Sequence, residues 1–344
     1  MKVGVIGATG IVGQRFIDLL HDHPFFKLTE IIASENSAGK RFSEACRYQV
    51  KQFPEKISSM EVKSIKDDLD CELIFSAIPS EVAKRTEELL AERGYIVASN
   101  ASAHRMDRDV PLVIPEVNPE HLALIESQKK RRKSDGFIIT NPNCATIQLV
   151  LALKPVHDAF TVKKVHVVSM QAVSGAGYPG VASLDIIDNI IPYIKNEEEK
   201  VETEPLKIFG TVEGDHIENA DIRISASCNR VNVMEGHLEC VTVQLREKPD
   251  IESFKNAIKN FRGLPQRLNL PSAPKKPLIL MEEEERPQPR LDRDKERGMA
   301  CSVGRVREDP ILDFKFIVLG HNTIRGAAGA SILNAELLYR KKEI

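Results

Sequence analysis

The hexapeptide NPNCAT, residues 141–146, places a cysteine among small polar residues. An apolar run at 136–140 precedes it and another at 147–153 follows it, which predicts a strand, a short turn and a helix that begins near Cys144. The free N–H groups and the dipole at a helix start lower the pKa of a thiol and can hold an oxyanion. Cys144 is therefore a candidate nucleophile for a carbonyl carbon. The alternative is a small buried residue without chemistry.

A nucleophilic cysteine needs a partner that moves protons, and the chain has nine histidines. His237 follows Glu235 and Gly236 and lies between two strand-like runs, where an exposed ring could exchange protons. The alternative for such a histidine is a surface or capping residue.

A second group of residues, near the N-terminus, predicts phosphate binding. The sequence KVGVIGATGIVGQRF is typical of a short strand, a glycine-rich turn and the start of a helix. Glycines allow a tight turn and a close approach of backbone to a pyrophosphate, and the helix start supplies N–H groups. The spacing is GxxGxxG, and glycine also marks plain turns. The expected cofactor-binding residues here are Gly7, Thr9, Gly10, Ile11, Val12 and Gly13.

The end of the next expected strand, 27–33, is where the adenosine ribose of a dinucleotide is bound. It is followed by SENSAGKRF, in which Ser34, Ser37 and two basic residues favour the 2′-phosphate of NADP. Glu35 could instead pair with the free 2′-hydroxyl of NAD. A solvated polar loop is the alternative. We expect NADP as the cofactor, with NAD as the second choice.

Composition excludes several classes of partner. The 344 residues suffice for two domains, and 42% hydrophobic and 28% charged residues are ordinary for a globular protein. A net charge of -2, the absence of Trp and 5% aromatic residues give no case for nucleic acid. No apolar stretch is long enough to span a membrane or form a signal peptide. The six cysteines are scattered without metal-binding spacing, so we expect free thiols, no metal site and a cytoplasmic location.

Strand-like runs at 73–78 and 95–98 flank a helix-favouring segment, which predicts a doubly wound parallel sheet of the Rossmann type. In the second half, 165–170 and 238–245 are strand-like, whereas 183–194 and 251–261 have helical spacing. We therefore expect an α/β protein whose second, α+β domain contains a mixed sheet. A long helix is expected near the C-terminus, after residue 322.

Ordered motifs along nearly the whole chain resemble the aspartate-β-semialdehyde dehydrogenase family, in particular its archaeal and fungal branch. They are GATGIVGQRF, SENSAGK, SNASAHRM, VPLVIPEVN, TNPNCATIQ, MQAVSGAGYPG, IPYIKNEEEKVETEPLKIFG, ISASCNRVNVMEGHLE, RPQPRLDR and HNTIRGAAGASILNAE. The resemblance implies reversible, NADPH-dependent reduction of β-aspartyl phosphate to aspartate semialdehyde and phosphate. This step belongs to the biosynthesis of lysine, methionine, threonine and isoleucine.

The resemblance also implies a role for each matching residue. Cys144 would form a thioester, His237 would act as acid and base, and Gln171 would position the acyl group. The substrate would be bound by Arg230 (α-carboxylate), Glu204 (ammonium) and Arg105, Lys207 and Asn143 (phosphate). Ser174, Gly175 and Asn322 would neighbour the nicotinamide. Glu35 stands where relatives often have Arg, which leaves strict use of NADP in doubt.

The family further implies a discontinuous NADP-binding domain, residues 1–141 plus 322–344, and a catalytic and dimerisation domain, residues 142–321. A homodimer or homotetramer is expected, with small molecules as the only other partners. Malonyl-CoA reductase and other acyl-group reductases remain alternatives, because they would keep Cys144 and His237. A non-catalytic NADP-binding regulatory protein is the alternative from another class. A short-chain reductase is excluded, since none of the five tyrosines has Lys four residues on.

Overall fold

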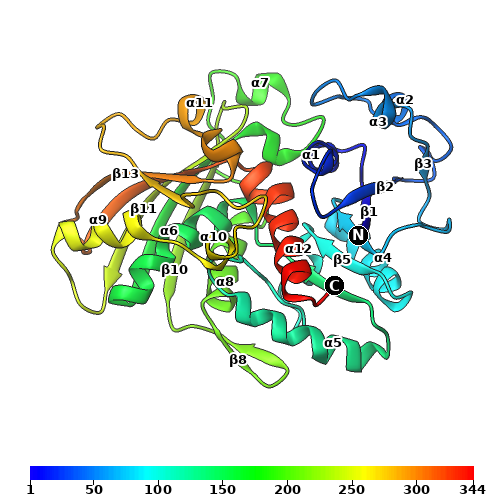
Figure 1. Ribbon diagram of the computed structural model, residues 1–344. Coiled ribbons are helices and arrows are strands. Elements are labelled where there is room, and N and C mark those ends of the chain that lie inside the picture. Colours follow the sequence, from blue (N-terminus) through cyan, green and yellow to red (C-terminus); the bar gives the residue numbers. More distant parts are fainter.

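The computed structural model describes residues 1–344, which form two lobes, each built on a six-stranded sheet (Figure 1). The first sheet has the order β3-β2-β1-β4-β5-β6 and all its strands are parallel. Its strands are β1 (Lys2–Ile6), β2 (Lys27–Ile32), β3 (Val62–Lys63), β4 (Leu73–Ser76), β5 (Ile96–Ser99) and β6 (Phe137–Thr140). The order reverses between β1 and β4, and dinucleotides bind at such a switch point.

The helices of this lobe connect its parallel strands. They are α1 (Ile11–Leu20), α2 (Phe42–Ala45), α3 (Glu55–Ser58), α4 (Ser80–Glu92) and α5 (Leu124–Arg132), with the 3-10 turns η1 (Ser102–His104) and η2 (Pro119–Ala123). The C-terminal helix α12 (Gly329–Lys341), preceded by a π-helical turn η5 (Ile324–Ala328), returns to this lobe and packs against α1 and β5. Apolar side chains of α12 join the core of the first sheet, so segments from the two ends of the chain share one core.

The second sheet is mixed, with the order β10-β7-β11-β14-β13-β12. Its strands are β7 (Val162–Gln171), β10 (Arg223–Arg230), β11 (His237–Leu245), β12 (Leu278–Leu280), β13 (Cys301–Glu308) and β14 (Phe314–Gly320). β10 runs parallel to β7 and β12 parallel to β13, whereas β11 is antiparallel to both of its neighbours. Both expected sheet types, parallel and mixed, are confirmed.

Three long helices pack on this sheet: α6 (Cys144–Phe160), α8 (Glu197–Ile208) and α9 (Ile251–Asn260). Shorter elements are α7 (Ser183–Ile186), α10 (Leu264–Arg267), α11 (Pro289–Asp292), η3 (Val173–Ala176), η4 (Lys295–Gly298) and the hairpin β8 (Thr211–Glu213) and β9 (His216–Glu218). The helix expected over 183–194 is wrong beyond α7. Asp188 has a positive φ of 57°, and Pro192 further restricts the backbone, so the segment continues as turns.

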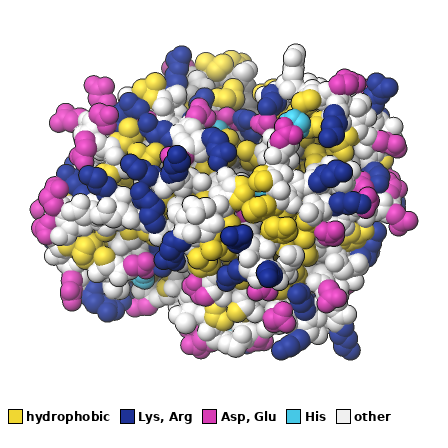
Figure 2. Space-filling view, in the orientation of Figure 1, with side chains coloured by type: hydrophobic (Ala, Val, Ile, Leu, Met, Phe, Trp, Pro, Cys, Tyr) yellow, Lys and Arg dark blue, Asp and Glu magenta, His cyan; other side chains and the backbone are white.

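Residues of β11 alternate strictly between buried and partly exposed, because its inner side faces α6 and the core. This alternation turns His237 inward, toward the start of α6. Charged side chains of both signs are interspersed over the face shown in Figure 2, without one large field of a single sign. None of the helices combines the length and the apolar composition that a membrane crossing requires.

Candidate active site

A cavity of about 1000 Å³ extends from the glycine-rich turn after β1 to the start of α6, and residues of both lobes line it. Among the residues expected at the cofactor, most line this cavity: Gly7, Thr9, Gly10, Ile11, Val12, Ser34, Ser174, Gly175 and Asn322. Ser37 and Gly13 do not. Ser37 belongs to a turn that is closed by its own N–H and the carbonyl of Ser34.

The glycine-rich turn has the shape that a dinucleotide requires. Gly7 has a φ of +78°, and a Cβ at Gly13 would lie 2.2 Å from the carbonyl oxygen of Gly7. Gly13 therefore serves the close packing of α1 on the turn, whereas Gly7 allows the turn itself. The residue before the first turn of α1 is Gly10, which has no side chain that could cap the first N–H groups of the helix. These groups face the cavity and fit a pyrophosphate.

Cys144 is the first residue of α6, as expected, and its thiol faces the cavity. The side chain of Asn143 caps the helix by accepting from the N–H groups of Ala145 and Thr146. This cap does not engage the N–H of Cys144, which as the first residue of the helix has no intrahelical acceptor. The structure also brings His237 to this point: its Nε2 lies 3.2 Å from Cys144 Sγ. The two residues are 93 positions apart in the chain.

The tautomer of His237 is set by a backbone contact. The N–H of Ala172 donates to Nδ1 of His237 at 3.1 Å, so the proton of a neutral ring is on Nε2 and points to the cysteine sulfur. Burial, reinforced by the neighbouring Arg230 and His321, lowers the pKa of His237 to about 3. The resting ring is neutral and donates a hydrogen bond to Sγ.

Burial raises the pKa of the Cys144 thiol to about 12, and the nearby carboxylate of Glu197 acts in the same direction. The expectation of a lowered thiol pKa is therefore wrong for the free protein, because desolvation outweighs the helix dipole here. Arg105, Arg230 and Lys200 oppose the rise in pKa. The site holds a thiol whose anion depends on these cations and on the His237 N–H.

Two glycines permit the close packing around this pair. A Cβ at Gly326, in η5, would lie 2.8 Å from the Cβ of Cys144, and one at Gly175 would lie 2.9 Å from Nη1 of Arg230. Gln148, one turn into α6, donates from Nε2 to the carbonyl oxygen of His237 and ties the strand end to the helix. Sequence reasoning missed Gln148, although its position four residues after Cys144 places both on one helix face.

Arg230, at the end of β10, lies in the cavity wall and is buried. Its Nη1 donates to the carbonyl oxygen of Ala172 at 2.7 Å, which orients the guanidinium. Gln171, at the end of β7, also lines the cavity, and its Nε2 donates a hydrogen bond to the hydroxyl oxygen of Ser169. Asn322 accepts from the N–H of Gly236 and donates to Ser174, so it joins the turn before His237 to the expected nicotinamide site.

The structure separates two Glu–Lys pairs on α8 that the sequence places seven residues apart. Glu197 and Lys200 line the cavity, whereas Glu204 and Lys207 do not. Lys207 donates to three backbone carbonyls, and Glu204 pairs with Arg105. The expected direct contacts of Glu204 and Lys207 with substrate therefore disagree with the structure. Glu197, which accepts from the Asn143 side chain at 2.8 Å, and Lys200 are the pair that lines the cavity.

Glu235, in the turn before His237, forms a contact between the lobes. It accepts from Arg15 of α1 at 2.9 Å and from Thr323 at 3.0 Å. Burial opposes ionisation, but His321 and Arg15 outweigh it and lower the pKa of Glu235 to about 2. The carboxylate is thus charged and links the helix of the cofactor turn to the strand that carries His237.

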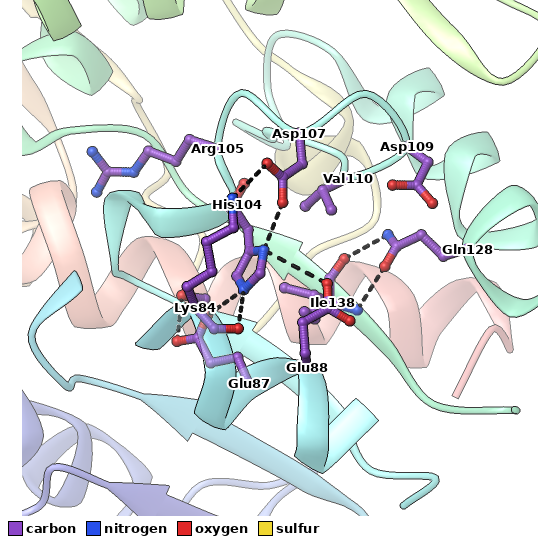
Figure 3. Close-up of polar contacts among 12 residues, drawn as sticks. Lys84, Glu87, Glu88, His104, Arg105, Asp107, Asp109, Val110, Gln128 and Ile138 are labelled. Atoms are coloured by element: carbon purple, nitrogen blue, oxygen red, sulfur yellow. Dashed lines mark hydrogen bonds and ion pairs between the residues drawn. The ribbon is translucent and has the colours of Figure 1, made fainter. Parts of the chain in front are cut away.

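A cluster behind the cavity contains Glu88, His104 and Asp107, whose ligand-type atoms approach one another within 4.8 Å. Figure 3 shows His104 between these carboxylates and Glu87, with Lys84 beside them. Nδ1 of His104 lies 2.7 Å from Asp107, and Glu88 is paired with Arg132 at 2.9 Å. Protein cations and the ring already balance these carboxylates, so the cluster is an ion-paired support for the loop of residues 104–110.

The lobes, the cavity between them and the Cys–His pair define a class of enzyme, the semialdehyde dehydrogenases. Residues 2–125 match the model of the semialdehyde dehydrogenase NAD binding domain, and residues 153–325 match that of the semialdehyde dehydrogenase dimerisation domain. Within this class the chain is similar to aspartate-semialdehyde dehydrogenases of archaea and fungi. The chain is 55% identical to the aspartate-semialdehyde dehydrogenase of Archaeoglobus fulgidus, over 100% of this chain and 99% of the relative. It is 42% identical to that of Saccharomyces cerevisiae, over 99% and 98%.

Solved structures agree. That of aspartate semialdehyde dehydrogenase with NADP from Candida albicans has a TM-score of 0.92 and 41% identity, and covers 100% of this chain and 99% of its own. The chain belongs to the aspartate-semialdehyde dehydrogenase family.

Proposed function

We propose that this protein catalyses the reversible, NADPH-dependent reduction of β-aspartyl phosphate to aspartate semialdehyde and phosphate. The observation that carries the proposal is the cavity that joins a dinucleotide turn to the Cys144–His237 pair at 3.2 Å. The family supports the choice of substrate, and the Candida albicans relative is described with NADP. The product would enter the biosynthesis of lysine, methionine, threonine and isoleucine.

Cys144 would attack the acyl carbon as its thiolate. The bond from the acyl carbon to the phosphate oxygen breaks, a thioester forms, and the departing phosphate takes up the proton that the thiol has lost. NADPH, when bound at the glycine-rich turn, would supply the hydride that reduces the thioester. The resulting thiohemiacetal oxyanion collapses to the aldehyde and returns the thiolate. One proton from solvent returns this thiolate to the resting thiol, so the net reaction consumes one proton together with the hydride.

The backbone and His237 would stabilise the charges that appear in these steps. The His237 Nε2–H lies beside the cysteine sulfur, and together with the N–H of Cys144 at the start of α6 it would hold the thiolate and then the oxyanion. The resemblance implied acid–base transfer through Nε2, but the Ala172 N–H occupies the Nδ1 lone pair, so Nε2 carries the proton of the neutral ring and has no free acceptor for the thiol proton. We therefore assign His237 the role of a hydrogen-bond donor.

The charged groups of the cavity would hold the substrate ends. The guanidinium of Arg230 suits the α-carboxylate, and the carboxylate of Glu197 suits the ammonium group. Arg105, Lys200 and Asn143 would hold the phosphate. Gln171 would position the acyl group, and Ser174, Gly175 and Asn322 would neighbour the nicotinamide.

The chain is proposed to act in the cytoplasm as a homodimer or homotetramer, with domains of residues 1–141 plus 322–344 and residues 142–321. The matched dimerisation domain supports an oligomer. Large apolar side chains of α7 and of the turns between α7 and α8 are exposed in the single chain: Leu184 is 90%, Ile187 57%, Ile190 60% and Tyr193 62% exposed. Such a group of side chains is typical of a surface covered in an assembly.

The test is the absorbance of reduced nicotinamide after mixing aspartate semialdehyde, phosphate and NADP or NAD with the wild-type protein and with Cys144→Ser. Phosphate-dependent reduction of NADP by the wild type alone is expected. Activity only when CoA replaces phosphate would instead assign the protein to the malonyl-CoA reductase type. Absence of activity with both would contradict the proposal.

A further inference from the structure

Helix α8 carries a second Glu–Lys pair, Glu204 and Lys207, two turns farther along the helix and outside the cavity lining. Both residues are buried, at 2% and 4% exposure, yet their charged groups are fully engaged by the protein. A buried charged pair is costly to desolvate, and its partners therefore indicate what it holds in place.

Lys207 holds a loop. Its ammonium donates to the carbonyl oxygens of Arg105, Asp107 and Val110 at 2.7, 2.7 and 2.8 Å. An ammonium has three protons, and all three are used by these carbonyls. Lys207 thus has no donor left for a phosphate, but it gathers the backbone of residues 105–110 around one point.

Glu204 connects that loop to the nucleophile. Its Oε1 accepts from Nη1 of Arg105 at 2.8 Å, and its Oε2 accepts from the backbone N–H of Asn143 at 2.7 Å. Asn143 is the capping residue immediately before Cys144. One buried carboxylate therefore spans the cation expected at the phosphate and the helix start that carries the thiol.

The opposite side of the loop is fixed by the cluster in Figure 3. His104 is bound to Asp107 at 2.7 Å and to the carbonyl oxygen of Lys84, while the side chain of Arg105 extends away from the cluster. Nη2 of Arg105 donates to the carbonyl oxygen of Asn100, and its Nε has no protein partner although it is buried. The contacts with Glu204 and Asn100 thus use two of the five guanidinium N–H groups of Arg105, which also lines the cavity.

We infer that Glu204 and Lys207 are positioning residues, which set the place of the Arg105 guanidinium relative to Cys144 and thereby the binding of phosphate. The inference rests on the proposed function and reassigns two residues that sequence reasoning placed at the substrate. Lys207 acts through the loop backbone, and Glu204 acts through direct contacts with Arg105 and Asn143.

A double-mutant cycle tests this. The KM for phosphate, the KM for NADP and kcat are measured for the wild type, Lys207→Met, Arg105→Ala and the double variant. Lys207→Met is expected to raise the KM for phosphate by tenfold to about a hundredfold, because misplacing a group by about 1 Å can cost on the order of a hundredfold. The KM for NADP should not change. In the Arg105→Ala background, Lys207→Met should have no further effect on phosphate.

Calorimetric titration with inorganic phosphate gives the same comparison for variants that turn over too slowly. Lys154→Met, which removes a partly exposed ion-pair lysine on α6, is the matched control and should bind phosphate as the wild type does. Glu204→Gln, which keeps one acceptor oxygen, replaces Lys207→Met if that variant does not fold, and the same result is expected of it.

The outcomes separate the two proposals. An equal effect of Lys207→Met with and without Arg105 would show direct phosphate contact and overturn the inference alone. An unchanged KM for phosphate in a folded Lys207→Met or Glu204→Gln protein would overturn it too. A wild type without phosphate-dependent activity and without phosphate binding would overturn the proposed function, and this inference with it.

Discussion

Replacing His237 by Gln and by Ala distinguishes a hydrogen-bond donor from a base. The side-chain amide of Gln reaches about as far as Nε2 and can still donate to Cys144 Sγ, but it cannot accept a proton at neutral pH. A hydrogen bond to a charged group contributes about 1.5–3 kcal/mol, which corresponds to roughly a tenfold to hundredfold change in thiolate population. His237→Ala should therefore lower the reactivity of the thiol by that factor, whereas His237→Gln should stay near the wild type.

The assay is alkylation of Cys144 by iodoacetamide between pH 6 and 10, followed on the peptide that contains Cys144 so that the other cysteines do not contribute. Burial raises the pKa of this thiol to about 12, so the rate for the wild type should rise about tenfold per pH unit without levelling off. A plateau with a midpoint near pH 6 would show a preformed thiolate–imidazolium pair. Equal losses in His237→Gln and His237→Ala would also refute the donor role.

Three further predictions concern stability, cofactor choice and packing. The folded state lowers the pKa of His237 from 6.5 to about 3, so the unfolded state binds more protons below pH 6.5 and the wild type loses stability as the pH falls. His237→Gln lacks this titration. Between pH 6.5 and 5 its free energy of unfolding, measured by thermal unfolding, should therefore fall by about 2 kcal/mol less than that of the wild type. A wild type as insensitive as the variant would contradict this. Glu35 accepts a hydrogen bond from Ser64 at 2.7 Å and forms an exposed ion pair with Lys66. Glu35→Gln should therefore change the ratio of kcat/KM for NADP to kcat/KM for NAD by less than about threefold. A tenfold change in this ratio would place Glu35 at the ribose. Gly326→Ala would put a Cβ 2.8 Å from that of Cys144, so kcat should fall and the free energy of unfolding should decrease by about 1–3 kcal/mol. An unchanged kcat in this variant would contradict the prediction and show that η5 can shift to make room.

The sequence predicts the parts of this site that depend on local pattern. A strand, a turn and a helix around Cys144 follow from apolar periodicity, and the glycine-rich turn follows from the conformations that only glycine adopts readily. Likewise, the alternation of β11 turns His237 inward once one face of the sheet is buried. The family resemblance adds the pairing of the two residues.

Other features depend on the tertiary structure. Glu197 and Glu204 are seven residues apart, which is two helical turns, so they share a helix face, and each is followed three residues later by a lysine. Only the position of α8 against the cavity decides which pair meets the substrate. The pKa of the Cys144 thiol also depends on the tertiary structure. A helix start predicts a lowered pKa, but both lobes together bury the thiol, and this burial raises its pKa instead. The short length of α7 reflects local backbone conformations that helical spacing does not reveal.

The most direct test of the account is a burst experiment without phosphate. Aspartate semialdehyde and NADP are mixed with the protein, and both the NADPH formed and the mass of the Cys144 peptide are measured. About one NADPH per site and an aspartyl adduct on Cys144, released when phosphate is added, are predicted, because the thioester then has no acceptor. NADPH formation that continues without phosphate, a burst that persists in Cys144→Ser, or an adduct on another residue would contradict the thioester at Cys144.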